Sequence, residues 1–206
     1  MDKFDATYID KELDEIGKRV KHPAKIYLIG GCAMSFRKLK ETTKDVDIVF
    51  KNRSDYNTFC DALFGAQYYT PFTIKQEHEY LETTRVCENK DGFHLDLFIK
   101  KVCGKMVISD DMVKRAELYK KYGDLSVYLL SREDIFLFKA LASAARKRDL
   151  DDMKLIYPGL DWAAIQKELF SQQLSSELIE HLICRLEEFS TSFELEVPIL
   201  KSLKRQ

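Results

Sequence analysis

Two aspartates, Asp45 and Asp47, lie on either side of Val46 and are followed by Ile48, Val49 and Phe50. Carboxylate and apolar residues that alternate in this way are typical of a β-strand, where side chains two positions apart share a face. Two carboxylates on one face repel each other unless a cation lies between them. Mg²⁺ is the expected cation, because it prefers a few carboxylates together with phosphate oxygens. The alternative is a pair of solvated acids that begins an edge strand.

A glycine pair precedes these acids. Gly30 and Gly31 follow the apolar run Ile26-Tyr27-Leu28-Ile29, which predicts a buried strand. Without Cβ atoms, the pair permits a tight turn and a close approach of backbone N–H groups to a ligand. A helix that begins there favours an anion such as a triphosphate. The pair and the two acids together indicate phosphoryl-type transfer from a nucleotide.

The glycine pair, thirteen intervening residues and then Asp45-Val46-Asp47-Ile48 resemble the signature of the DNA polymerase β-like nucleotidyltransferase superfamily. The Thr43-Lys44-Asp45-Val46-Asp47 segment is similar to a small prokaryotic branch that includes abortive-infection-type nucleotidyltransferase toxins. The resemblance implies that Asp45 and Asp47 are catalytic and bind Mg²⁺ or Mn²⁺. It also implies that Gly30 and Gly31 bind an NTP. Many relatives carry Ser at the second glycine position, so here that phosphate contact is either lost or supplied by backbone.

A further acid lies in the apolar segment Phe93–Ile99, which should form a hairpin with Thr83–Cys87. Strand periodicity puts His94, Asp96 and Phe98 on one face of this strand. Asp96 is therefore either buried with a partner or part of a site. By the family resemblance it is the third catalytic and metal-binding carboxylate, and it can accept the proton of the attacking hydroxyl.

A second motif runs from Leu130 to Asp152 and resembles a Lys-x-x-Ala … Arg-x-x-Asp-x-x-Asp element of the toxin-like branch. Lys139 lies on the apolar side of a predicted helix, and Arg146 follows two helical turns later. Both are predicted to bind nucleotide phosphates. Alternatively, Lys139 extends to the surface while Arg148, Asp149 and Asp152 pair with one another. One of the three basic residues Arg37, Lys38 and Lys40 can face phosphate. The commoner outcome for such residues is that they are solvated charges on the helix surface.

Composition limits the class of protein. The chain has 206 residues, 45% of them hydrophobic, and a net charge of −1, so it is not an electrostatic nucleic-acid binder as a whole. Its five cysteines are scattered and odd in number, a pattern that suits reduced thiols in a cytoplasm. The sequence shows no signal peptide and no apolar run long enough to span a membrane. We therefore expect a soluble cytoplasmic protein with no membrane partner.

The elements predict an α/β (α+β) fold: a nucleotidyltransferase-like mixed sheet with flanking helices, plus a C-terminal helical bundle. The domains expected are a catalytic core over 1–130 and a helical domain over 131–206. Strands are predicted near 26–29, 45–50, 83–87, 93–99 and 126–130, with short ones at 68–69 and 72–74. Helices are predicted over about 6–20, 32–40, 55–64 (capped by Ser54), 109–118 (capped by Ser109), 162–171 and 176–190, with two more between Ser131 and Pro158.

The predicted function is metal-dependent transfer of an NMP from an NTP to an acceptor hydroxyl, with release of pyrophosphate. A protein, a small hydroxylated molecule and a tRNA 3′ end all stay open as acceptors. The toxin resemblance adds a cognate antitoxin as a candidate partner, although the sequence names none. One alternative is a nucleotide- or partner-binding protein that keeps the fold without turnover. The other is a structural protein whose acids are surface charges.

Overall fold

The computed structural model describes residues 4–71, 83–142 and 147–205. The chain forms two compact units. The first contains Met1–Gly104 and Ile108–Leu130, and the second contains Lys105–Val107 and Ser131–Gln206. The predicted strand at 72–74 and the predicted site residue Arg146 lie outside the described residues.

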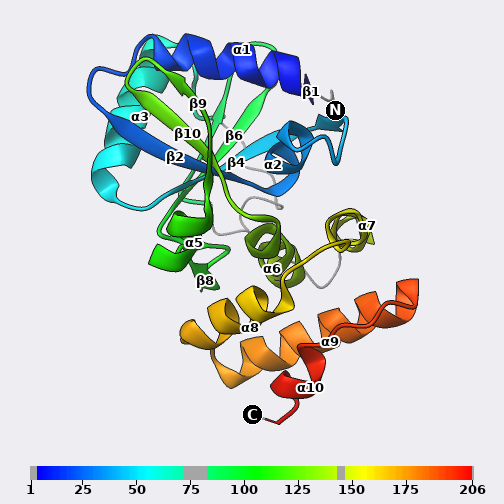
Figure 1. Cartoon of the computed structure of the whole chain (residues 1–206). Coiled ribbons are helices and arrows are strands. Elements are labelled where there is room, and N and C mark those ends of the chain that lie inside the picture. The colour runs from blue at the N-terminus through cyan, green and yellow to red at the C-terminus, as the bar shows by residue number, and fades with distance from the viewer. Residues whose placement is uncertain (1–3, 72–82, 143–146, 206) are drawn as a thin grey trace. The chain divides into compact units, whose positions relative to one another are not determined.

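A mixed β-sheet forms the centre of the first unit (Figure 1). In the described part of the chain it has six strands, in the order β5-β6-β4-β2-β10-β9. Their bounds are β2 (Ala24–Ile29), β4 (Asp45–Phe50), β5 (Arg85–Glu88), β6 (His94–Ile99), β9 (Glu117–Tyr122) and β10 (Leu125–Leu129). β4 is parallel to β6 and β2 is parallel to β10, whereas the other neighbours are antiparallel. This mixed sheet with flanking helices confirms the predicted α/β class.

Helices α1 (Ala6–Gly17) and α3 (Arg53–Gly65) pack against each other beside the sheet (Figure 1). Ile9, Leu13 and Ile16 form the predicted apolar stripe of α1 and are fully buried. The Phe50 ring at the end of β4 contacts the Tyr56 and Phe59 rings of α3, each at 5.4 Å between centroids. Aromatic packing therefore fixes the C-terminal end of β4 in the core.

Further short elements complete the described part of the first unit, and one more, β8 (Met106–Val107), belongs to the second unit. Those of the first unit are β1 (Phe4–Asp5), α2 (Gly30–Phe36), β3 (Thr42–Thr43), β7 (Lys101–Val102) and α5 (Asp110–Arg115). β1 pairs with β3 in antiparallel register, Phe4 opposite Thr43 and Asp5 opposite Thr42. The first described residues of the chain are thereby paired, as a short β-strand, with the segment that leads into β4.

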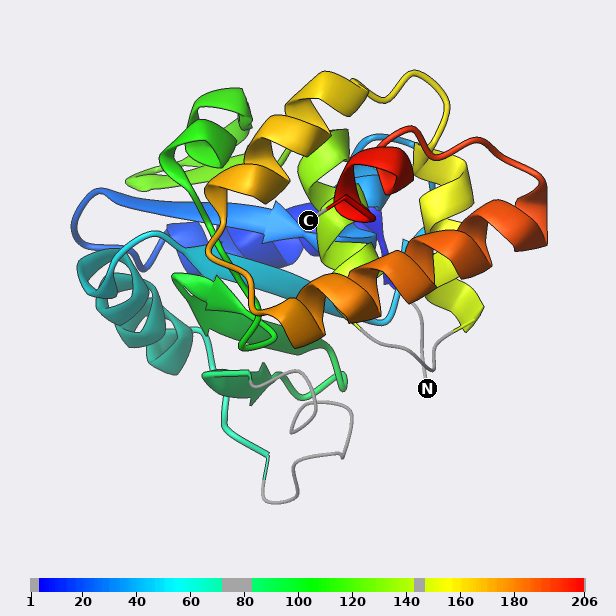
Figure 2. The same ribbon diagram turned by 90° about the horizontal axis from the view of Figure 1, so that it is seen from below.

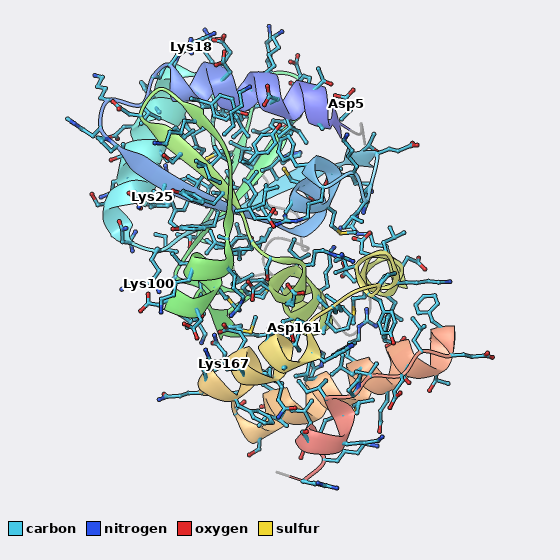
Figure 3. All side chains as sticks on the ribbon, in the orientation of Figure 1. Asp5, Lys18, Lys25, Lys100, Asp161 and Lys167 are labelled. Atoms are coloured by element: carbon cyan, nitrogen blue, oxygen red, sulfur yellow. The ribbon has the colours of Figure 1, made fainter. Side chains whose placement is uncertain are left out.

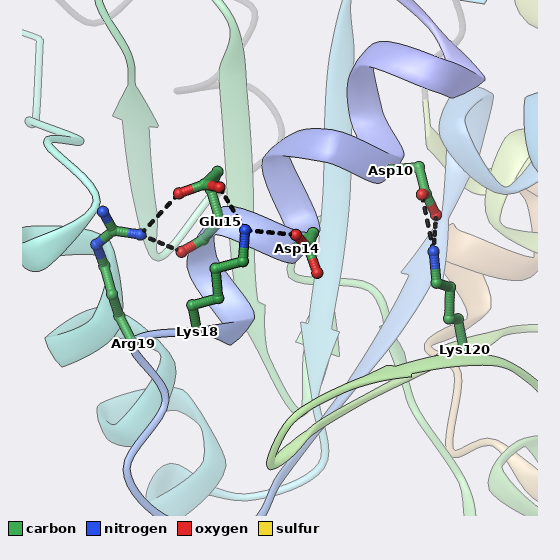
Figure 4. A network of polar contacts seen from close by, with 6 residues as sticks. All are labelled: Asp10, Asp14, Glu15, Lys18, Arg19 and Lys120. Carbon is green, nitrogen blue, oxygen red and sulfur yellow. Dashed lines mark hydrogen bonds and ion pairs between the residues drawn. The ribbon is translucent and has the colours of Figure 1, made fainter.

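Charged residues cover the outer face of α1. Figure 3 shows Asp5 and Lys18 at the two ends of this helix, and Asp5 caps its N-terminus. In Figure 4, Lys18 reaches Asp14 and Glu15 at 2.8 and 2.7 Å, while Lys120 of β9 reaches Asp10 at 2.9 Å. Such exposed pairs contribute little stability one by one. Asp10 also accepts hydrogen bonds from Tyr119 and Tyr122, so it ties edge strand β9 to α1.

The described part of the second unit is mainly helical: α6 (Arg132–Ala142), α7 (Lys147–Ile156), α8 (Trp162–Ser171), α9 (Ser176–Phe193) and α10 (Leu200–Leu203). Figure 2 shows these helices in yellow-green to red. The Phe136 ring of α6 lies 5.5 Å from Trp162 and 5.7 Å from Phe189, so aromatic rings join α6, α8 and α9. Asp161 and Ser175 cap α8 and α9, as predicted.

Three local predictions were wrong. Asn52, not Ser54, caps α3, because its side chain accepts a hydrogen bond from the Asp55 N–H. The helix predicted over 109–118 ends at Arg115, and strand β9 follows it without having been predicted. The helix predicted over 32–40 begins at Gly30 and ends at Phe36. Among the described residues, no helix combines the length and apolar composition needed to cross a membrane.

Candidate active site

The glycine pair lies where β2 passes directly into α2. Gly30 has φ +63°, a left-handed conformation that L side chains rarely adopt. A Cβ on Gly30 would lie 2.0 Å from Asp47 Oδ2. The Asp47 carboxylate therefore packs directly on the bare α-carbon of Gly30. Glycine is required here both for the backbone turn and for the approach of this acid.

Strand register brings the three predicted acids to one face of the sheet. In the parallel pair β4–β6, Asp47 lies opposite Asp96 and Asp45 lies opposite His94. Side chains of register partners in neighbouring strands share a face, so all three carboxylates share one face, together with His94. Val46 and Ile48 point to the other face and are fully buried. Asp96 is only 1% exposed, whereas Asp45 and Asp47 are half-buried.

The side chains as they stand do not gather tightly around one point. In the described part of the chain, no group of three or more His, Cys, Asp or Glu side chains is placed to hold a metal ion. Ionised carboxylates repel one another, which favours separated rotamers. The backbone register and the oxygen donors fit a divalent ion, provided that side-chain rotation brings the oxygens together. We conclude that the strands position the three acids and that a metal centre stays a prediction.

The buried thiol of Cys32 reports the electrostatics beside these acids. Cys32 lies in α2, which packs against β4. Burial raises the pKa of this thiol well above its usual value, and the negative charges of Asp47 and Asp45 raise it further. Cys32 is therefore a neutral thiol, neither a thiolate ligand nor a nucleophile. The same field that disfavours a thiolate favours a cation in this part of the unit.

Thr43, which the sequence motif contained without a role, is a structural residue of the site. A Cβ on Gly31 would lie 2.6 Å from Thr43 Oγ1, so the threonine packs on the second glycine. Its hydroxyl donates to the Asp45 carbonyl at 3.0 Å, and strand β1 pairs with it through Phe4. Thr43 therefore connects the glycine turn, the first acid and the N-terminal strand. Its position two residues before Asp45 was the only signal in the sequence.

Ser35 does not supply the hydroxyl that many relatives carry next to the first glycine. It is buried, and its hydroxyl donates to the Gly31 carbonyl at 3.1 Å within α2. This back-bond to the carbonyl four residues earlier holds the hydroxyl inside the unit. Any phosphate contact at the glycine pair therefore depends on backbone N–H groups or on another side chain.

Lys139 belongs to the second unit, where two buried acids bind it. Its Nζ lies 2.8 Å from Asp149 Oδ1 and 2.7 Å from Asp152 Oδ2. Burial by itself lowers the pKa of Lys139, but the two aspartates outweigh it, so the pKa is raised. Lys139 does not extend to the surface, and both Asp149 and Asp152 pair with it. Its role in nucleotide binding stays a prediction, as does that of Arg146.

Comparison with known proteins supports the fold assignment. No protein-family model matches the chain, and no curated protein matches it by sequence. Among solved structures, the nucleotidyltransferase ANT(2")-Ia in complex with adenylyl-2"-tobramycin is similar at a TM-score of 0.51 and 14% identity, over 81% of this chain and 95% of that one. JHP933 from Helicobacter pylori is similar at a TM-score of 0.46 and 12% identity, over 98% and 94% of the two chains. The fold is thus nucleotidyltransferase-like, and the abortive-infection branch stays a prediction.

Gly30→Ala tests the contact between the glycine and Asp47. The new Cβ meets both a left-handed backbone and the Asp47 carboxylate, so the free energy of unfolding should fall and Asp47 should be displaced. Gly92→Ala is the matched control, because Gly92 has φ +73° but its nearest neighbour would be Glu88 Oε1 at 3.7 Å. In urea denaturation, we expect Gly30→Ala to lower the free energy of unfolding by at least about 1 kcal/mol more than Gly92→Ala does. Equal losses would show that Asp47 does not press on Gly30.

Lys139→Met should strongly destabilise the second unit. It leaves two buried carboxylates without their shared cation, which costs about 3–5 kcal/mol of unfolding free energy. Because its pKa is raised on folding, the contribution of Lys139 is present below the usual lysine pKa and is lost as pH rises through the folded-state value. Lys201→Met is the control, since it breaks only an exposed pair with Glu196. If urea denaturation gave similar losses for both variants, the buried pairs would not stabilise the unit.

Proposed function

We propose that this protein is a metal-dependent nucleotidyltransferase that moves an NMP from an NTP to an acceptor hydroxyl. The observation that carries the proposal is the β4–β6 register, which sets Asp47 beside Asp96 while Asp47 packs on Gly30. Hard oxygen donors next to a glycine turn suit the joint binding of a divalent ion and a polyphosphate. The likeness to ANT(2")-Ia supports the fold that such a reaction uses.

Each site residue has a defined role in the proposed reaction. Asp45, Asp47 and Asp96 would hold Mg²⁺ or Mn²⁺, and the Gly30–Gly31 backbone faces the phosphates. The acceptor oxygen forms a bond to the α-phosphorus, the bond from that phosphorus to the β-phosphate bridging oxygen breaks, and pyrophosphate leaves. Asp96, the most buried of the acids, takes the hydroxyl proton. Divalent ions held by these acids would supply charge stabilisation of the transferring phosphoryl group.

Label transfer is the test of this proposal. The protein is incubated with Mg²⁺, each α-³²P-labelled NTP and, in turn, a protein extract, a set of hydroxylated small molecules and tRNA. An aminoglycoside is the first small molecule to assay, because the ANT(2")-Ia structure holds adenylylated tobramycin. We expect label transfer that requires the divalent ion. No transfer and no metal-dependent NTP binding would overturn the proposal.

Asp47→Asn should reduce this transfer by about a hundredfold or more, because metal-borne charge stabilisation is worth several kcal/mol. Asp61→Asn is the matched control, since Asp61 is an exposed acid on α3 and not one of the three carboxylates on β4 and β6. It should leave the rate within about twofold, as exposed surface changes usually do. Equal rates for Asp47→Asn and wild type would remove Asp47 from the reaction.

A second function is favoured by one observation. The Ser35 hydroxyl is bound to the Gly31 carbonyl, so the hydroxyl next to the glycine turn in many relatives has no counterpart from this helix. This loss suits a protein that binds nucleotide or a partner without turnover. Calorimetry that shows NTP affinity unaffected by Asp47→Asn, together with no product, would select this alternative.

A further inference from the structure

The end of α2 folds the chain back toward the helix start. The Leu39 N–H donates to the Met34 carbonyl at 3.0 Å, and the Lys38 N–H donates to the Ser35 carbonyl at 2.9 Å. Lys38 itself is left-handed, with φ +59°. This pattern is a Schellman motif with lysine in the position that usually holds glycine. It reverses the chain after only seven helical residues, which the predicted helix to Lys40 did not anticipate.

The reversal brings Lys40 to the glycine pair. Its Nζ lies 4.0 Å from the position that a Cβ would take on Gly31. Two residues later the chain enters β3, where Thr43 packs on Gly31 and pairs with Phe4. The backbone on both sides of Lys40 is therefore fixed, by the Schellman motif before it and by β3 after it. Lys40 is half-buried, and its ammonium group lies at the turn that the proposed function assigns to phosphate.

The other two cations of this segment are directed elsewhere. The Arg37 guanidinium lies near Glu117 Oε2 at 3.4 Å and the Leu129 carbonyl at 3.5 Å. Lys38 is exposed. Lys139, the lysine that the family resemblance selects, is bound by Asp149 and Asp152 in the second unit. Within the described part of the first unit, position thus distinguishes Lys40 from Arg37 and Lys38.

We propose that Lys40 binds the triphosphate of the NTP. The inference rests on the proposed function and adds a residue to it. A lysine ammonium is a compact charge with three donors, and it can bind phosphate oxygens at the glycine turn while the carboxylates bind the metal. Lys40 then replaces the missing serine hydroxyl as the side chain that contacts phosphate. It also places a positive charge where negative charge develops on the leaving pyrophosphate.

The test compares Lys40→Met with Lys40→Arg and a matched control. Lys38→Asn removes the same charge from the same loop, and asparagine tolerates the left-handed backbone. Calorimetry measures Kd for the Mg²⁺–NTP complex at saturating Mg²⁺, and a Mg²⁺ titration measures the ion concentration needed for binding. We expect Lys40→Met to raise this Kd about ten- to a hundredfold. Lys40→Arg should recover most of the affinity, and Lys38→Asn should change Kd by less than about twofold.

The outcomes separate this inference from the proposed function. Wild type that binds no NTP in any metal condition would overturn the proposed function itself. Wild type that binds, with Lys40→Met binding equally well, would overturn the Lys40 inference alone. If Lys40 only balances the acids, Lys40→Met should lower the Mg²⁺ requirement and leave Kd for NTP unchanged, which also contradicts the inference. Thermal unfolding checks that the variants fold, and Lys40→Gln replaces Lys40→Met if that variant does not.

Discussion

The candidate site depends on one close contact, the Asp47 carboxylate against the α-carbon of Gly30. Strand β2 must end where it does for this contact to form, because Ile29 is the register partner of Asp47 in the antiparallel β2–β4 pair. The chain can then turn only through a left-handed residue, which glycine adopts without strain. Asp96 comes to the same face of the sheet through the parallel β4–β6 register. A shift of one residue in either strand pair would send these acids to the opposite, apolar face.

The two units compensate buried charge in different ways. In the second unit, Lys139 lies between Asp149 and Asp152, so cation and anions are buried together within hydrogen-bonding distance. In the first unit, like charges share one face, and they add to the effect of burial in raising the pKa of the Cys32 thiol. A set of acids held on one face by strand register favours a cation from solution. This difference is why we propose metal binding in the first unit and regard the Lys139 pairs as stabilising interactions.

Local patterns predicted much of the fold. The bounds of β4 and the capped starts of α8 and α9 follow from alternation and capping residues, which are properties of neighbouring positions. Strand β9 was missed because its polar sequence becomes an edge strand only through pairing with β10 and contacts with Asp10. Thr43 was given no role in the site, and Lys40 could not be distinguished from Arg37 and Lys38, for a similar reason. Their places depend on the chain reversal after α2 and on pairing with β1, which no short stretch of sequence encodes.

A crystal of the protein soaked with Mn²⁺ and a non-hydrolysable NTP analogue tests the account most directly, because manganese has an anomalous signal that locates it without ambiguity. We predict an anomalous peak bound by carboxylate oxygens of Asp47 and Asp96, with the Asp45 carboxylate turned toward it and the triphosphate against Gly30 and Gly31. A peak at other residues, or nucleotide bound while these three acids stay apart with no ion among them, would contradict the account.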